Sequence, residues 1–127
     1  MQRSARQEVI ALWCRRAFGV EHTTNVEQRA VRLLEEAIEL HQAAGGQRAM
    51  AHKLIDYIYD REPDSIAREV GGVSVTLLAF CNAAGLSADR EEQREIDRIL
   101  SKPPEHWRKR NDAKNAAGFD TTKDTRR

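Results

Sequence analysis

Glu36 and Glu39 lie one helical turn apart in a predicted helix, beside an apolar stripe that includes Leu33. Carboxylates at this spacing repel each other unless a positive charge lies between them. The guanidinium groups of Arg29 and Arg32, on the same flank of the helix, are one source of that charge. A divalent cation is the other. The residue types alone leave both interpretations open.

Glu69 is the third acid of interest, because it is the one acid in a long apolar stretch. A buried carboxylate without a partner is costly, so Glu69 needs a counter-charge or a proton. If its helix packs antiparallel to the helix of Glu36 and Glu39, the three carboxylates converge. Hard oxygen ligands completed by water suit Mg²⁺. The alternative is a salt bridge from Glu69 to Arg29 or Arg32.

Other metal chemistries do not fit the spacing of the histidines and cysteines. Di-iron bundles use Glu-x-x-His, but His41 follows Glu39 by two residues and Glu36 by five. Cys14 and Cys81 stand far apart, and no CxxC pair exists. We therefore expect two reduced thiols in the core.

The elements that position these residues are all predicted to be helices. The chain has 127 residues, 32% of them charged, with only 7 Gly and 3 Pro, a composition that favours amphipathic helices. We predict one all-α domain over residues 1–119, a bundle of about five helices completed by oligomerisation, and a disordered tail over 120–127. Hydrophobic periodicity and capping residues predict helices over residues 5–18, 26–44, 47–59, 65–84 and 87–100, with a short one over 105–113.

The stretch from residue 65 to 84 is apolar on nearly all sides. Such a helix lies at the centre of a bundle or at an oligomer interface. It is too polar for a membrane span, and the first residues contain no apolar run typical of a signal peptide. We therefore expect a cytoplasmic protein that does not enter a membrane.

Two segments resemble the motifs of the MazG-like all-α nucleoside triphosphate pyrophosphohydrolases. Arg32–Leu40 looks like their EExxE helix, and Arg68–Leu77 looks like their second motif, E-x-x-D, followed by an apolar helix. The resemblance covers about residues 26–85. It departs from the family pattern at Gly72, which stands where the second motif has its acid.

The resemblance implies hydrolysis of a nucleoside triphosphate to the monophosphate and pyrophosphate, with Mg²⁺, or Mn²⁺, as cofactor. It assigns Glu36, Glu39 and Glu69 as metal ligands and leaves the place of the fourth ligand, at Gly72, to water or to Glu35. Glu35 matches the first acid of EExxE and is a candidate base for the attacking water; the alternative is a solvent-facing residue. The resemblance also implies a homodimer or homotetramer.

A basic C-terminal third is the candidate phosphate-binding region. Arg110, Asn111 and Lys114 can reach a triphosphate once this segment folds over the site; the alternative is a solvated tail. Trp13 can stack on a base, but core packing is the other interpretation. Residues 98–127 contain nine Lys or Arg residues, at positions 98, 102, 108, 109, 110, 114, 123, 126 and 127.

Two further functions stay open. One is a non-catalytic helical module that lost its chemistry with the acid at Gly72 and binds nucleotides or only assembles. The other is a small nucleic-acid-binding protein that uses the basic C-terminus, which the net charge of +1 does not favour.

Overall fold

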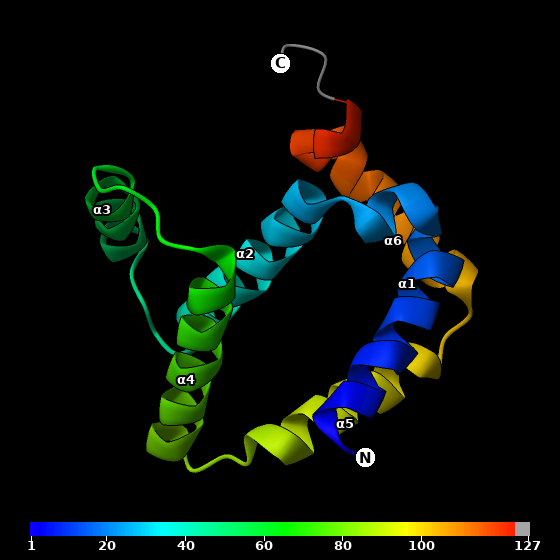
Figure 1. The fold of residues 1–127 in the computed structure, drawn as a ribbon, viewed down its shortest axis with the longest axis horizontal. Helices are drawn as coiled ribbons and strands as arrows, with labels where there is room; N and C mark the ends of the chain where they lie inside the picture. Colours follow the sequence, from blue (N-terminus) through cyan, green and yellow to red (C-terminus); the bar gives the residue numbers. More distant parts are fainter. Residues whose placement is uncertain (124–127) are drawn as a thin grey trace. The chain divides into compact units, whose positions relative to one another are not determined.

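The computed structural model describes residues 1–123, and every regular element in that range is a helix (Figure 1). The all-α prediction is therefore confirmed. The elements are α1 (Arg3–Thr24), α2 (Val26–Ala43), α3 (Arg48–Tyr59), α4 (Ile66–Ala84), α5 (Ala88–Leu100), α6 (Pro104–Lys114), the π-helical η1 (Asn115–Phe119) and the 3-10 helix η2 (Thr121–Lys123).

Capping residues set the helix ends where the sequence predicts them. The Asn25 side chain accepts a hydrogen bond from the backbone N–H of Gln28 at 2.8 Å, and Ser65 accepts one from that of Arg68 at 3.2 Å. Each bond satisfies an N–H group that has no partner inside the helix. Gly85 ends α4 with a left-handed φ of 70°, a conformation that glycine adopts without steric strain.

The first helix runs past its predicted end. Gly19 interrupts it, with φ 82° and ψ 165°, but helical structure resumes and continues to Thr24. The Thr23 and Thr24 hydroxyls donate to the carbonyls of Gly19 and Val20, at 2.7 and 2.9 Å. These local bonds hold a helical turn over residues 22–24, beyond the predicted end of the helix at residue 18.

By its internal contacts the chain divides into two compact units, and the single domain expected over residues 1–119 stays a prediction. The first unit contains Met1–Gly45 and the chain from Ile99 onward, and the second contains Gly46–Arg98. In the first unit, α1 packs on α6 and contacts α2. The return of the C-terminal segment to α1 and α2 is therefore what closes this unit.

An aromatic core holds the first unit together. Ala17, Ile99 and Trp107 are buried, and the half-buried Trp13 and Phe18 pack against them. The Trp107 indole N–H donates to the carbonyl of Ile99 at 2.9 Å, so this large side chain is buried with its polar atom satisfied. This core therefore consists of residues from α1, α5 and α6.

The segment predicted as a disordered tail begins with residues that contact α2. The backbone N–H and the hydroxyl of Thr121 both donate to the side-chain oxygen of Gln28, at 2.9 and 3.0 Å. Gln28 is fully buried. Residues 120–123 are thus part of the first unit, because a buried amide on α2 requires their hydrogen bonds. Residues 124–127 of the predicted tail lie outside the described residues.

In the second unit, α4 keeps its apolar surface exposed. Val70 and Val75 are 62% and 65% exposed, so within the chain α4 is not the buried central helix that we predicted as one of two possibilities. Among the described residues, α4 is the one helix long and apolar enough to cross a membrane, with mean hydropathy 1.2. Its place at an oligomer interface stays a prediction.

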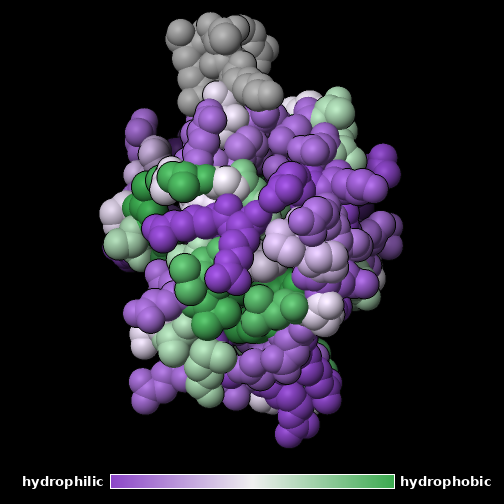
Figure 2. Space-filling view, turned by 90° about the vertical axis from the view of Figure 1, so that its right-hand side faces the viewer, coloured by the Kyte–Doolittle hydropathy of each residue, from purple (hydrophilic) through white to green (hydrophobic). Residues whose placement is uncertain are grey.

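Apolar side chains also reach the surface elsewhere. Figure 2 shows the side of the molecule that faces right in Figure 1, where apolar side chains gather among hydrophilic ones. Leu12 on α1 and Leu33 on α2 are 53% and 54% exposed. Both cysteines, in contrast, are buried and unpaired as predicted: Cys14 in the first unit and Cys81 in the second.

Candidate metal centre

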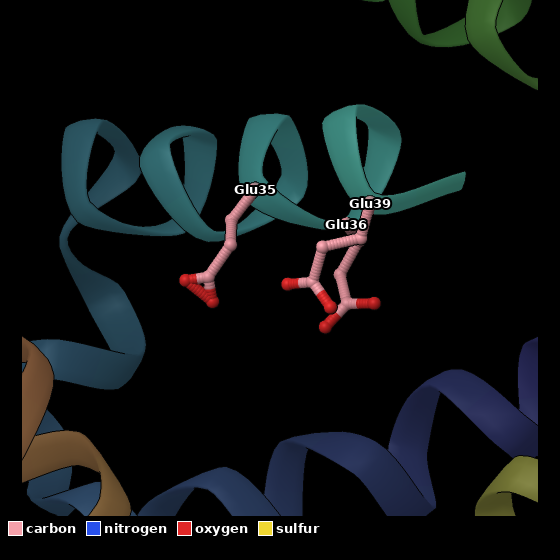
Figure 3. Close-up of side chains that lie close together, drawn as sticks. All are labelled: Glu35, Glu36 and Glu39. Atoms are coloured by element: carbon pink, nitrogen blue, oxygen red, sulfur yellow. The ribbon is translucent and has the colours of Figure 1, made fainter. Parts of the chain in front are cut away.

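Three carboxylates gather on one side of α2. Each of Glu35, Glu36 and Glu39 offers an oxygen, and these oxygens lie within 4.8 Å of one another. Figure 3 shows all three side chains leaving the same side of the helix. Glu39 lies three positions after Glu36 and four after Glu35, and residues at these two spacings share a helix face, which explains the grouping. We call these three residues the acid group.

The acid group differs from the predicted ligand set in one member. Glu36 and Glu39 are present as predicted, and Glu35 stands beside them, as the sequence allowed for a missing fourth ligand. Glu69 lies on α4, in the second unit. Its convergence with Glu36 and Glu39 therefore stays a prediction.

A lysine from the C-terminal segment contacts the acid group. The Lys114 ammonium donates to Oε1 of Glu35 at 2.5 Å, across 79 residues of sequence. The Glu35 side chain is 28% exposed, and Glu36 and Glu39 are exposed. A cationic side chain and three carboxylates thus meet at the surface of the first unit.

Two asparagines dock the same segment on Arg32. Nη2 of Arg32 donates to the side-chain oxygens of Asn111 at 3.0 Å and Asn115 at 3.2 Å. Asn111 is buried, and the two asparagines are four residues apart, so they face the guanidinium from successive turns. Asn111 and Lys114 therefore lie at α2, where the sequence predicted a segment folding over the site.

The Arg32 guanidinium also faces Glu35. Its Nη1 lies 3.9 Å from Oε2 of Glu35. Burial lowers the pKa of Arg32, while the charge of Glu35 opposes that shift. The group stays charged at neutral pH, because the pKa of an arginine ordinarily exceeds about 12. The α2 surface therefore combines a half-buried cation with the acid group.

Gln28, Arg32 and Glu35 form a polar stripe at positions i, i+4 and i+7 of α2. Each contacts the C-terminal segment: Gln28 bonds Thr121, Arg32 bonds the two asparagines and Glu35 bonds Lys114. The sequence analysis did not single out Gln28 or Asn115. The helical spacing of the three polar residues was the signal that could have found this stripe.

Trp13 and Arg110 have their contacts in the aromatic core. The Trp13 ring packs edge-on against Phe18 and Trp107, with centroids 5.2 and 5.7 Å apart. The Arg110 guanidinium lies 5.7 Å from the Trp107 ring centroid. These contacts match the core interpretation of Trp13, and substrate binding by either residue stays a prediction.

A shallow hollow in the C-terminal segment lies next to the docked asparagines. It is lined by Asp112, Asn115, Ala116 and Asp120. Two of the four side chains are acidic, so this hollow does not favour an anionic ligand.

Comparisons of the chain with protein-family models, with curated proteins and with solved structures gave no match. The likeness to MazG-like enzymes therefore rests on the two motifs in Arg32–Leu40 and Arg68–Leu77. The three residues of the acid group are the three acids of the first motif, EExxE.

Proposed function

We propose that the protein is a Mg²⁺-dependent nucleoside triphosphate pyrophosphohydrolase. One observation carries this proposal: the acid group of α2 lies against Lys114, brought from the far end of the chain. Carboxylates that bind a divalent cation, next to a cation that binds phosphate, are what hydrolysis of a nucleotide requires.

The chemistry of the acid group fits Mg²⁺. Glu35, Glu36 and Glu39 supply hard carboxylate oxygens and no sulfur or imidazole. Mg²⁺ uses one or two such carboxylates, and water and phosphate oxygens complete its octahedral shell. Glu69 is the proposed further ligand. A bound Mg²⁺ would neutralise phosphate charge and lower the pKa of the attacking water.

The side chains of the first unit have distinct proposed roles. Lys114 pairs with a phosphate oxygen as a point charge. Glu35 accepts the proton of the water that attacks the α-phosphorus. The bond from that phosphorus to the bridging oxygen breaks, so a monophosphate and pyrophosphate leave. Arg32 and Asn111 hold Lys114 in place.

The proposal includes self-association, to at least a dimer. Large apolar side chains on α3 and on α4 are about half exposed or more, and apolar surface gathered in this way is typical of interaction sites. They are Met50, Leu54, Ile55, Ile58, Ile66, Val70, Val73, Val75 and Leu78. We propose that a second copy of the chain covers these side chains.

The test is pyrophosphate release from a panel of ribo- and deoxyribonucleoside triphosphates, with and without Mg²⁺. We expect Mg²⁺-dependent release that Glu36→Gln abolishes and that Glu35→Gln lowers by about 100-fold, the contribution of a general base. Glu62→Gln, an exposed acid outside both motifs, is the matched control and should match the wild type. Release that survives in Glu36→Gln would contradict the proposal.

The second candidate is a non-catalytic module, which Gly72 favours. A Cβ added at Gly72 meets no atom within 4 Å, so Gly72→Asp restores the acid of the second motif without a clash. In a lapsed enzyme this change should tighten Mn²⁺ binding. The absence of pyrophosphate release by folded wild-type protein from any triphosphate would favour the module over the enzyme.

A further inference from the structure

Lys114 forms an ion pair with the Glu35 carboxylate, which a metal bound to the acid group would need as a ligand. Its ammonium bonds Oε1 of Glu35 at 2.5 Å, and Glu35 is one of the three residues whose oxygens form the acid group. A lysine ammonium is a compact charge that satisfies a carboxylate much as a metal ion does. The two cations therefore have one ligand in common.

The C-terminal segment does not depend on Lys114 for its position. Arg32 bonds Asn111 and Asn115, and Gln28 bonds Thr121 on the other side of Lys114. Lys114 itself is 33% exposed, so solvent reaches its side chain. The ammonium can leave Glu35 on its flexible four-carbon stem while the backbone of the segment stays docked.

We propose that Lys114 is an exchangeable counter-charge: it neutralises Glu35 in the metal-free protein, and a divalent cation displaces it. The displaced ammonium then becomes available to a triphosphate. This inference rests on the proposed function and deepens it, because it makes metal binding the step that prepares the phosphate site. Metal and triphosphate then bind cooperatively, each favouring the state in which Lys114 has left Glu35.

Charge counting supports the exchange. Three carboxylates with the Lys114 ammonium and the Arg32 guanidinium beside them have a net charge of about −1, and replacing the ammonium with a divalent cation brings that to about zero. The ammonium that leaves keeps its charge and lies beside the site. It therefore attracts the phosphates that the remaining carboxylates alone would repel.

The experiment measures the affinity of the protein for Mn²⁺ alone by electron paramagnetic resonance, in wild type, Lys114→Met and Lys109→Met. Lys109 is exposed on the same helix, so Lys109→Met removes one charge without removing the contact with Glu35. We expect Lys114→Met to bind Mn²⁺ about fivefold more tightly than the wild type, because the metal no longer has to break the partly exposed ion pair between Lys114 and Glu35. Lys109→Met should match the wild type. Equal or weaker binding by Lys114→Met would overturn the exchange.

A double-mutant cycle gives a second measurement. In a Glu35→Gln background the shared carboxylate is gone, so Lys114→Met should no longer change Mn²⁺ affinity. If Lys114→Met still tightens Mn²⁺ binding in the Glu35→Gln background, the gain comes from the general loss of a positive charge, and the proposal is overturned. If no variant binds Mn²⁺, both the metal site and the exchange are wrong, whereas binding that is insensitive to Lys114 overturns the exchange alone.

Discussion

The two units of the chain bury their apolar side chains to very different degrees. In the first unit, Ala17 is fully buried and Trp107 is 7% exposed at the centre of an aromatic core. In the second, Val70 and Val75 keep more than half of their surface exposed. The first unit also exposes apolar side chains such as Leu33, so the difference lies in the aromatic core that this unit contains.

We propose that this difference separates chemistry from assembly. The first unit has its own core, and it carries the acid group, Arg32 and Lys114, so it positions these residues of the candidate site. The second unit leaves uncovered the kind of surface that elsewhere packs against another protein. We infer that it supplies the contacts between copies, and the following changes test that contrast.

Trp107→Ala should have the largest effect, because it empties the core of the first unit. The substitution removes the edge-on ring contact with Trp13 and the hydrogen bond from the indole N–H to the carbonyl of Ile99. We expect the free energy of unfolding to fall by about 3–5 kcal/mol, measured by urea denaturation. Arg110→Ala, which removes only an exposed cation above the same ring, is the control. Equal losses in both variants would mean that the aromatic core is not what holds this unit.

Gln28→Leu should have the next largest effect. It leaves the N–H and hydroxyl of Thr121 without the acceptor that they share, and an unsatisfied buried group costs about 1–3 kcal/mol. Urea denaturation measures the loss, and hydrogen exchange should show faster exchange at Thr121. Thr121→Val, which removes one of the two bonds, should lose less. An unchanged exchange rate would show that the segment does not need Gln28.

Val75→Asp tests the second unit. A charge in a covered apolar surface should raise the dissociation constant of the oligomer about tenfold. This corresponds to a loss of about 1.4 kcal/mol in the free energy of association. Light scattering at micromolar concentration measures the mass. His52→Asp introduces the same charge at an exposed polar position of α3 and should leave the mass unchanged. A monomeric wild type would remove the proposed role of this unit.

The smallest effect should come from matched caps in the two units. Asn25→Ala and Ser65→Ala each remove one bond to a helix N–H, worth about 1 kcal/mol. We expect the losses to appear locally, as faster amide exchange in α2 and in α4 respectively. Equal acceleration in both helices from either change would show that the units unfold together, contrary to the division.

Local structure was predictable because short-range chemistry determines it. Asn25, Ser65 and Gly85 mark helix ends through bonds and dihedral angles within a few residues. The contact between Thr121 and Gln28 was not predictable, since it joins residues 93 positions apart and neither residue signals the other.

The candidate site was predictable in part for the same reason. Glu36 and Glu39 share a helix face by spacing alone, and Glu35 joins them. Lys114 was singled out for its charge, but its contact with Glu35 depends on how α6 packs on α1. The periodicity around Leu33 identified an apolar face of α2, yet that side chain is 54% exposed, because a pattern shows which residues share a face and not what covers it.

The burial of both cysteines makes this chain a convenient background for site-directed labelling. Burial raises the pKa of the Cys14 thiol, with Arg29 acting in the opposite direction, so little of the reactive thiolate is present at neutral pH. Cys81 is also shielded from reagents by burial. A maleimide dye should therefore react with a cysteine introduced at an exposed position such as Lys109 before it reaches either native thiol, and fluorescence can then follow the C-terminal segment in the otherwise unaltered protein.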